Sequence, residues 1–113
     1  MKSINSRSTP LVYQFLLQIP KGKVVTYGMI AKQIGCKSAR LIGNILHQNP
    51  NPQKFPCYKV VNAEGKIAIN YAYGGKKEQI KRLKKDGIEV NNNKVNLKKY
   101  LWIPQIVDFT VNN

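Results

Sequence analysis

Acidic residues are scarce in this chain of 113 residues, which has five of them against 19 lysines and arginines. They are Glu64, Glu78, Asp86, Glu89 and Asp108, and no two of them form an obvious pair. A nuclease that uses two metal ions needs several clustered carboxylates. The composition therefore argues against that class of enzyme.

Ligands for metals and nucleotides are also scarce. The chain has one histidine, His47, and two separated cysteines, Cys36 and Cys57, so a zinc site is not expected. No glycine-rich loop of the kind that binds phosphate groups is present, so no nucleotide cofactor is predicted. We expect a protein that needs neither a metal nor a cofactor.

Long apolar runs are missing as well. No stretch of about 18 apolar residues could span a membrane, and the N-terminal segment has no small-residue cleavage site of a secretion signal. We therefore expect one cytoplasmic, monomeric domain over residues 1–113. In that reducing compartment the two cysteines need not form a disulfide.

Positive charge is the abundant feature, with a formal net charge of +14. Such a charge first suggests a polyanion, above all nucleic acid, as the partner. The alternative is a solubilising surface without a charged partner. Membrane-surface binding is less favoured, because no segment combines a basic face with a broad apolar one.

Apolar spacing predicts a helix over residues 10–19 that starts near Pro10. The residues that repeat at helical intervals are Val12, Phe15, Leu16 and Ile19. After the segment PKGK, the β-branched segment VVTY follows, and Thr26 is a candidate N-cap for the next helix.

Two short helices joined by a tight turn are predicted over residues 26–50. Gly35 supplies the turn, and Ser38 can cap the second helix. The apolar faces consist of Met29, Ile30 and Ile34 in the first helix and Leu41, Ile42, Ile45 and Leu46 in the second. The pattern describes a helix-turn-helix. The net charge favours DNA binding over the alternative, an ordinary αα-hairpin in a helical core.

A hairpin and a further helix are predicted from the sequence pattern of the second half of the chain. The segment YKVVNAEGKIAI indicates two short strands around a turn at 62–65. The segment KKEQIKRLKKDGI predicts a helix with Ile80 and Leu83 inward and Gly87 just after its end. The expected fold class is mainly α with a small β-hairpin, arranged as a winged-helix-like helix-turn-helix DNA-binding domain.

Cys57 lies directly after Pro56 in the rigid segment FPCYKVV. A thiol in this setting is either a reactive nucleophile or a small hydrophobic residue that fills a core. The residues alone leave both interpretations open. Cys36, in the turn between the two helices, is interpreted as incidental.

Taken together, these motifs resemble the DNA-binding, alkyl-accepting domain of the O6-alkylguanine-DNA alkyltransferases. The matching segments span about residues 10–103 in the order GKVVTYGMIA, SARLIGNILHQNP, PCYKVVNAEGKI, YAYGG and LKKDGI. The family motif Pro-Cys-His-Arg-Val stands here as Pro-Cys-Tyr-Lys-Val. The N-terminal domain of full-length members has no counterpart, as in the alkyltransferase-like proteins, which differ in replacing the cysteine.

The resemblance implies double-stranded DNA containing O6-alkylguanine as the partner. The second helix would bind the minor groove, and the damaged nucleotide would rotate out of the duplex. Arg40 would fill the space left by the base, while Tyr27 would help to rotate the nucleotide and would hydrogen-bond to it. The other residues implied at this surface are Ser38, Ala39 and Gly43, which allow close approach, and Asn44, which is bulkier than the usual residue.

The resemblance also implies that Cys57 accepts the alkyl group as a thiolate. Tyr58 replaces the histidine that takes the thiol proton, and with a reference pKa of about 10 it cannot be the base near neutral pH. Its hydroxyl would hold a water or donate to the thiolate. Asp86 stands where a glutamate orients that histidine, and Asn49 would tie the second helix to the cysteine turn. The charge of Lys59 is expected to favour the thiolate.

A pocket for the base and its alkyl group is expected around the cysteine motif and the segment NYAYGG. The implied lining residues are Leu46, Pro56, Lys59, Val60, Tyr71 and Tyr73. Tyr71 is matched to the pocket tyrosine of the family. Tyr73 is expected to narrow the pocket and to favour methyl over larger groups.

Three functions are compatible with these patterns. The leading hypothesis is a DNA repair transferase that moves the alkyl group to Cys57 in a single turnover. The alternative is a lesion-binding module that flips O6-alkylguanine without transfer and recruits downstream repair proteins, which the short layout and Tyr58 favour. The third is a helix-turn-helix transcription factor that reads the major groove.

Overall fold

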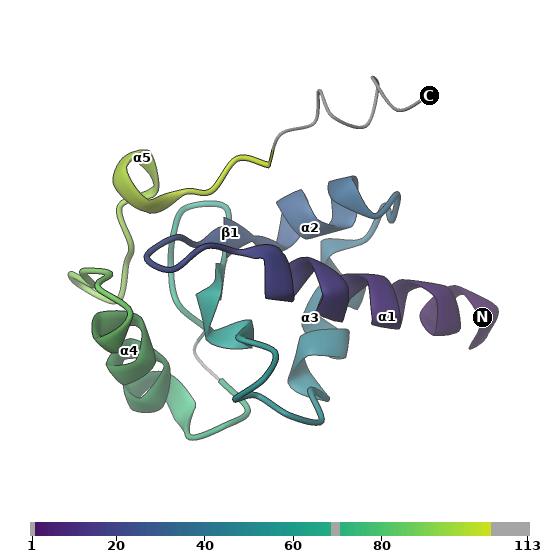
Figure 1. Cartoon of the computed structure of the whole chain (residues 1–113), viewed down its shortest axis with the longest axis horizontal. Coiled ribbons are helices and arrows are strands. Elements are labelled where there is room, and N and C mark those ends of the chain that lie inside the picture. Colours follow the sequence, from purple (N-terminus) through teal and green to yellow (C-terminus); the bar gives the residue numbers. More distant parts are fainter. Residues whose placement is uncertain (1, 69–70, 105–113) are drawn as a thin grey trace.

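The computed structural model describes residues 2–68 and 71–104, with side chains described from Thr9 onward. Figure 1 shows the order of the elements along the chain. They are α1 (Lys2–Gln18), β1 (Val25–Thr26), α2 (Tyr27–Gln33), α3 (Ala39–His47), the 3₁₀ turn η1 (Cys57–Lys59), β2 (Val60–Val61), α4 (Gly75–Lys85) and α5 (Leu97–Tyr100). The mainly helical class predicted from the sequence is confirmed.

Helices α2 and α3 form the predicted helix-turn-helix, and both predicted caps are confirmed. The Thr26 hydroxyl accepts a hydrogen bond from the Met29 amide at 3.1 Å, and the Ser38 hydroxyl accepts one from the Leu41 amide at 3.0 Å. These bonds satisfy backbone donors that each first helical turn leaves free. Gly35 has a φ of 77°, a left-handed conformation that suits the tight turn between the helices.

Helix α1 is longer than the sequence predicted, because it begins at Lys2 and contains Pro10 in its interior. The predicted inward face is confirmed, since Val12, Phe15 and Leu16 are buried. Proline removes one backbone hydrogen bond inside a helix and is better tolerated in the first turn. The sequence placed Pro10 near the start of the helix for this reason. That prediction is wrong, because α1 begins eight residues earlier, at Lys2.

The small sheet also differs from the prediction. Strand β2 pairs in parallel with β1, with Val25 opposite Val60 and Thr26 opposite Val61, so within the described residues the two strands do not form a hairpin. The turn itself is present, since the Gly65 amide donates to the Asn62 carbonyl at 2.9 Å. Beyond this turn Lys66 forms a bridge with Lys94 instead of extending a hairpin.

Helix α4 ends as predicted, with Gly87 in a left-handed conformation at a φ of 85°. The Gly87 amide donates to the Lys84 carbonyl, and the Ile88 amide donates to the Leu83 carbonyl. This pair of bonds is the Schellman motif, which closes a helix and brings two apolar residues together. Leu83 and Ile88 are accordingly fully buried in the same apolar cluster.

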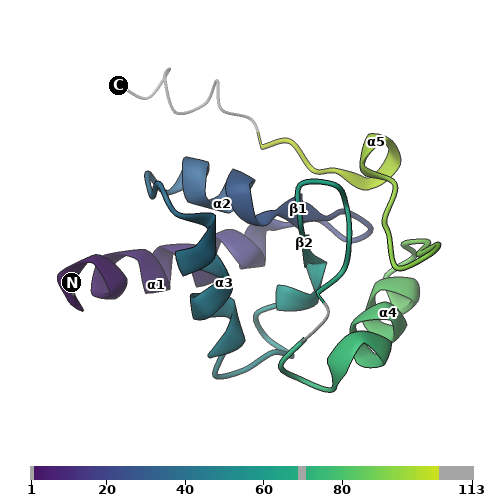
Figure 2. The same ribbon diagram turned by 180° about the vertical axis from the view of Figure 1, so that it is seen from behind.

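Two apolar clusters support the fold. The first lies between α1, α2, α3 and the Cys57 turn, and the second lies between β1, β2, α4 and α5. Figure 2 shows the two strands between α3 and α4 along the length of the molecule, with α1 crossing behind α3. Among the described helices, none combines the length and the apolar composition that a membrane span requires.

Candidate functional site

Cys57 lies at the start of η1, immediately after a very tight turn. Pro56 has φ −75° and ψ 71°, and the Cys57 amide donates to the Phe55 carbonyl at 2.7 Å. These values describe an inverse γ-turn, whose φ suits the ring of proline. The proline noted in the sequence therefore fixes the direction of the chain just before the thiol.

Asn49 connects the end of α3 to this turn. Its side-chain amide donates to the Phe55 carbonyl at 2.8 Å, and its side-chain oxygen accepts from the Asn51 amide at 2.9 Å. The side chain is buried with both groups satisfied, which makes the connection rigid. Cys57 is thus held at a fixed position relative to the helix-turn-helix.

A cavity of about 50 Å³ lies beside the thiol and opens to the surface. Its walls come from α2, α3, the cysteine turn, the segment before α4 and α4 itself. The lining residues are Tyr27, Gly43, Leu46, His47, Cys57, Ala68, Tyr71, Ala72, Tyr73 and Gln79. Cys57 is 5% exposed and forms part of the cavity wall, so this opening offers a route to the sulfur.

The outward face of α3 lies next to the cavity. Ile42, Ile45 and Leu46 are buried on one side of this helix. Positions spaced three and four residues apart form the other side, where Ala39, Arg40, Asn44 and His47 are exposed and Gly43 is partly buried. A Cβ added at Gly43 would meet no atom within 4 Å, so a side chain there would project into open space. Because residue 43 is a glycine, no side chain projects from α3 at this point beside the cavity.

Tyr73 closes part of the cavity wall against α3. Its hydroxyl donates to the Asn49 carbonyl at 2.6 Å and lies 3.1 Å from the His47 carbonyl. The Tyr71 and Tyr73 rings meet edge to face, with centroids 5.7 Å apart. The two tyrosines therefore stiffen the segment that faces the thiol.

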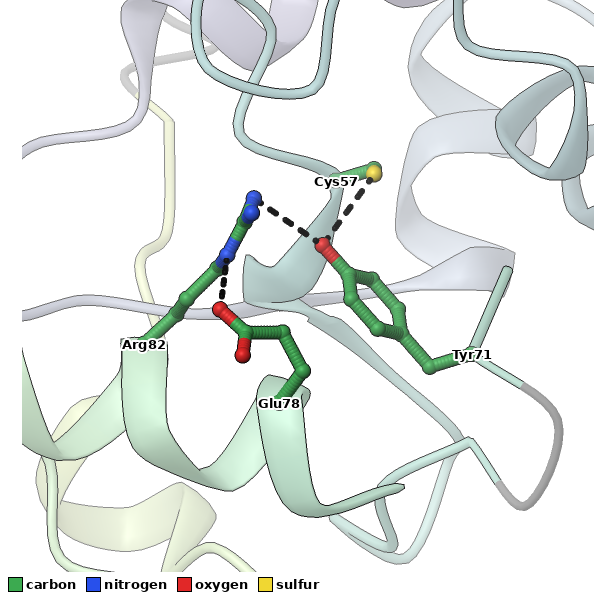
Figure 3. Close-up of polar contacts among 4 residues, drawn as sticks. All are labelled: Cys57, Tyr71, Glu78 and Arg82. Atoms are coloured by element: carbon green, nitrogen blue, oxygen red, sulfur yellow. Dashed lines mark hydrogen bonds and ion pairs between the residues drawn. The ribbon is translucent and has the colours of Figure 1, made fainter. Parts of the chain in front are cut away.

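The Tyr71 hydroxyl lies between the thiol and a cation, as Figure 3 shows. Its oxygen is 3.9 Å from Cys57 Sγ and 3.4 Å from Arg82 Nη1. Arg82 Nε in turn donates to Glu78 Oε2 at 2.9 Å, one turn earlier on α4. Thus four side chains from three segments form one chain of polar contacts.

Burial raises the pKa of the Cys57 thiol above its usual value. The neighbouring Asn49 and Tyr71 side chains and the charge of Arg82 act in the opposite direction. An uncharged sulfur is favoured in an apolar environment, while donors and nearby cations favour the thiolate. The site therefore contains groups that offset part of the cost of burying a sulfur anion.

Lys59 lies away from this site. Its ammonium group is 3.0 Å from Asp86 Oδ2 and donates to the Pro20 carbonyl at 2.8 Å. The same carboxylate oxygen accepts from the Gly22 amide at 3.1 Å. Lys59 and Asp86 thus form a buried ion pair that joins η1 to the end of α4 and to the loop before β1.

Tyr58 faces a second depression, which it lines together with Glu78, Arg82 and Asp86. Burial is the main reason that the pKa of Tyr58 rises to about 12, and the charge of Asp86 adds to it. The hydroxyl is therefore neutral near neutral pH. Tyr58 and Asp86 are brought together, on a different side of η1 from the cavity that contains Cys57.

The cavity contains some of the residues that the sequence placed there. Leu46, Tyr71 and Tyr73 line it, as do Tyr27 and Gly43 from the predicted DNA-binding set. Of the other predicted pocket residues, Pro56 shapes the cysteine turn, Val60 is buried in β2 and Lys59 pairs with Asp86. Over residues 2–68 and 71–104, no group of histidine, cysteine and acidic side chains could hold a metal ion.

The sequence interpretation missed Gln79 and Arg82 on α4. Gln79 is buried, donates to the Tyr58 carbonyl at 3.0 Å and accepts from the Ala68 amide at 2.9 Å. A signal existed, because Gln79 precedes the inward Leu83 by four residues and therefore lies on the same face of the helix. Arg82 is the one arginine in a helix whose other basic residues are lysines.

The fold and the site together define a helix-turn-helix protein with a cysteine-containing cavity beside its second helix. The family model described as 6-O-methylguanine DNA methyltransferase, DNA binding domain, matches residues 8–88. The chain belongs to this family.

Individual relatives have different functional names. A bifunctional methyltransferase/endonuclease from Picrophilus torridus is 43% identical over 88% of this chain, which spans about a third (33%) of that protein. A DNA base-flipping protein from Vibrio parahaemolyticus is 40% identical over 82% of this chain and 93% of its own length. The crystal structure of Schizosaccharomyces pombe Atl1 in complex with damaged DNA containing O6-carboxymethylguanine matches with a TM-score of 0.80 and 31% identity, over 88% of this chain and 97% of that one.

Proposed function

We propose that this protein repairs DNA by taking the alkyl group of O6-alkylguanine onto Cys57. One observation carries the proposal: the thiol, although buried, forms part of a cavity that opens beside the outward face of α3. An O6 substituent is inaccessible within a base pair, so the nucleotide must leave the duplex. A duplex held against α3 would place such a nucleotide at the opening.

The transfer is a displacement at the alkyl carbon. The Cys57 proton leaves to solvent, and the thiolate forms a bond to the carbon attached to O6 as the carbon–oxygen bond breaks. The bonding electrons stay with the guanine oxygen, and one proton from solvent returns guanine to its neutral form. Tyr27 would stabilise the developing charge by donating a hydrogen bond. The thioether is stable, so each molecule reacts once.

The outward face of α3 would contact the DNA. Arg40 is exposed there and would fill the space that the base leaves in the duplex. Ala39 and Gly43 are small enough for close approach, and Ser38 caps the helix at its DNA-facing end. The cost of extruding a base is a few kcal/mol, and it is lower for a damaged pair.

The size of the cavity favours small alkyl groups. Its volume is about 50 Å³, and Tyr73 forms part of its wall while tied to the end of α3. We expect methyl transfer to be faster than benzyl transfer, and Tyr73→Ala to raise the benzyl rate relative to the methyl rate. Single-turnover rates on duplexes that carry either group measure this. Equal methyl and benzyl rates in the unaltered protein would contradict the assignment of Tyr73.

Lesion recognition without transfer is the second candidate. It is supported by the names of relatives that flip bases or bind damaged DNA, and by the burial that raises the pKa of Cys57. In that case the protein would flip the damaged nucleotide and mark it for other repair proteins. The presence of a cysteine at position 57, which could accept the alkyl group, favours transfer over lesion marking.

Analysis of the DNA distinguishes the two candidates. A duplex with one O6-methylguanine is incubated with the full chain, digested to nucleosides and measured by mass spectrometry. Transfer predicts that one methylguanine becomes guanine for each protein molecule, that Cys57→Ser abolishes the conversion, and that Cys36→Ser does not. Persistent methylguanine, together with tighter binding than to unmodified DNA, would refute transfer and support lesion marking.

A further inference from the structure

The proposed transfer needs a group that stabilises the thiolate, and the residues first expected in that role lie elsewhere. Lys59 is paired with Asp86 at 3.0 Å, and Tyr58 faces the other depression. Cys57, however, is 5% exposed, in an environment that disfavours its anion. The Asn49 amide, which also lies near the sulfur, already donates to the Phe55 carbonyl. A further donor and a positive charge would therefore help the sulfur to react near neutral pH.

We propose that Tyr71 and Arg82 together stabilise the Cys57 thiolate, with Glu78 holding Arg82 in place. This inference rests on the proposed function and assigns positioning roles to three residues of the same site. The contacts run from Cys57 Sγ to the Tyr71 oxygen at 3.9 Å, and from that oxygen to Arg82 Nη1 at 3.4 Å (Figure 3). The first distance is within reach of a hydrogen bond to sulfur.

The chemistry of arginine fixes the direction of one of these hydrogen bonds, and the protonation state of the thiol fixes the other. A guanidinium group has donors only, so the Tyr71 oxygen accepts from Arg82, and while the thiol is protonated it also accepts from Cys57 Sγ. A thiolate has no hydrogen to give, so after ionisation the Tyr71 hydroxyl is the donor of the contact with sulfur. Accepting a bond from a cation also makes a hydroxyl a stronger donor. When the Cys57 proton leaves to solvent, Tyr71 keeps its hydrogen and donates it to the anion.

Tyr71 is protonated near neutral pH. Burial, followed by the nearby Cys57, raises the pKa of the Tyr71 hydroxyl well above its usual value. A tyrosine in this state acts as a hydrogen-bond donor and does not take the proton from the thiol. The role therefore differs from that of a general base.

Arg82 brings positive charge near the sulfur without being buried itself. Its side chain is 25% exposed and lines the depression outside the cavity, so the guanidinium group keeps part of its contact with water. The ion pair with Glu78 occupies Nε and leaves Nη1 directed to Tyr71. The Tyr71 hydroxyl thus links the partly exposed guanidinium group of Arg82 to the buried sulfur of Cys57.

Other titratable groups also face the cavity or act on Cys57. They are Tyr13 from α1, Tyr27 from α2, His47 from α3 and Tyr73 from the segment before α4. Burial is the largest cause that raises the pKa of each of these tyrosines above its usual value, so they are uncharged near neutral pH. His47 is exposed at the cavity edge.

Alkylation by a small reagent tests the proposal without DNA. The full chain reacts with iodoacetamide over a range of pH, and peptide mass spectrometry follows Cys57 and Cys36 separately. We expect Tyr71→Phe and Arg82→Gln each to move the Cys57 profile to higher pH and to lower its rate at neutral pH roughly tenfold. The Cys36 profile is the internal control for folding and reagent. Lys84→Gln, on the exposed side of α4, removes the same charge and should leave the Cys57 profile in place.

An unchanged Cys57 profile in either Tyr71→Phe or Arg82→Gln would overturn the proposal. The outcome is separate from that of the proposed function, because the reagent reaches the thiol without flipping a base. Shifted profiles without alkyl transfer from DNA would leave the Tyr71–Arg82 assignment standing and would remove only the repair reaction.

Discussion

Lys59 illustrates how far adjacency in sequence can mislead at the residue scale. It follows Cys57 by two residues, so its charge was expected to favour the thiolate. In the structure its ammonium group instead meets Asp86, with side chains that are 5% and 10% exposed. Its role in the described contacts is to join η1 to the end of α4, and the cation near the sulfur is Arg82, from a helix far along the chain.

Removing Lys59 should therefore destabilise the fold. Lys59→Met leaves the Asp86 carboxylate buried without its cation, and breaking a buried ion pair in this way costs about 3–5 kcal/mol. Lys66→Met breaks an exposed pair with Glu64, for which a loss of about 1 kcal/mol or less is expected. Urea denaturation measures both free energies of unfolding. Similar values for the two variants would contradict the structural role of Lys59.

At the scale of elements, α3 has a buried packing face and an exposed face, and the exposed face is the one proposed to contact DNA. Ile42, Ile45 and Leu46 are buried, whereas Arg40 and Asn44 are exposed on the other side. The buried face fixes the helix against the core, so the exposed face is a rigid surface. Function at this scale depends on which residues occupy that surface, while stability depends on the opposite one.

Arg40→Ala should reduce the preference for damaged DNA. Without the long side chain, the space left by an extruded base stays unfilled, and we expect the ratio of affinities for modified and unmodified duplexes to fall roughly tenfold or more. Lys37→Ala, in the neighbouring turn, removes the same charge and should weaken both duplexes equally. Fluorescence anisotropy with matched duplexes measures the ratio. An unchanged ratio in Arg40→Ala would contradict the flipping role.

Elements with local signals were predicted well. The caps at Thr26 and Ser38, the turn at Gly35 and the stop at Gly87 each depend on a few neighbouring residues, and the structure confirms them. The start of α1 was wrong, because Pro10 is a typical first-turn residue and the segment before it has no clear apolar period.

Elements that depend on distant residues were predicted less well. The sequence from 58 to 69 has the local pattern of a hairpin, but Val60 pairs with Val25. Pairing between residues this far apart in the sequence leaves no signal in the local pattern. The cavity is also built from residues that are distant in sequence. The family resemblance predicted Tyr71 and Leu46 as cavity residues, whereas the contact between Tyr71 and Arg82 was visible only in the structure. Side-chain direction on α4 decides that contact, and spacing alone does not fix it.

At the scale of the whole molecule, net charge should govern the strength of the proposed DNA binding. The formal charge is +14, and lysines supply most of it. Contacts between lysines and phosphates release counterions and carry no sequence information. General affinity would therefore come from the whole surface, and lesion preference from α3 and the cavity.

This division predicts equal salt dependence for modified and unmodified duplexes. If roughly six or more phosphates are contacted, each affinity should fall about a thousandfold or more between roughly 50 and 200 mM salt. The two lines of log affinity against log salt should be parallel, because lesion recognition adds no phosphate contact. Lines of clearly different slope would show that damaged DNA is bound through another set of charges.

The account as a whole depends on a covalent bond at one sulfur. Peptide mass spectrometry after incubation with an O6-methylguanine duplex tests this most directly. We predict that the peptide containing Cys57 gains the mass of one methylene group, up to one equivalent, while the Cys36 peptide stays unchanged. Unmodified Cys57 after the duplex has been bound, or methylation on another residue, would contradict the account.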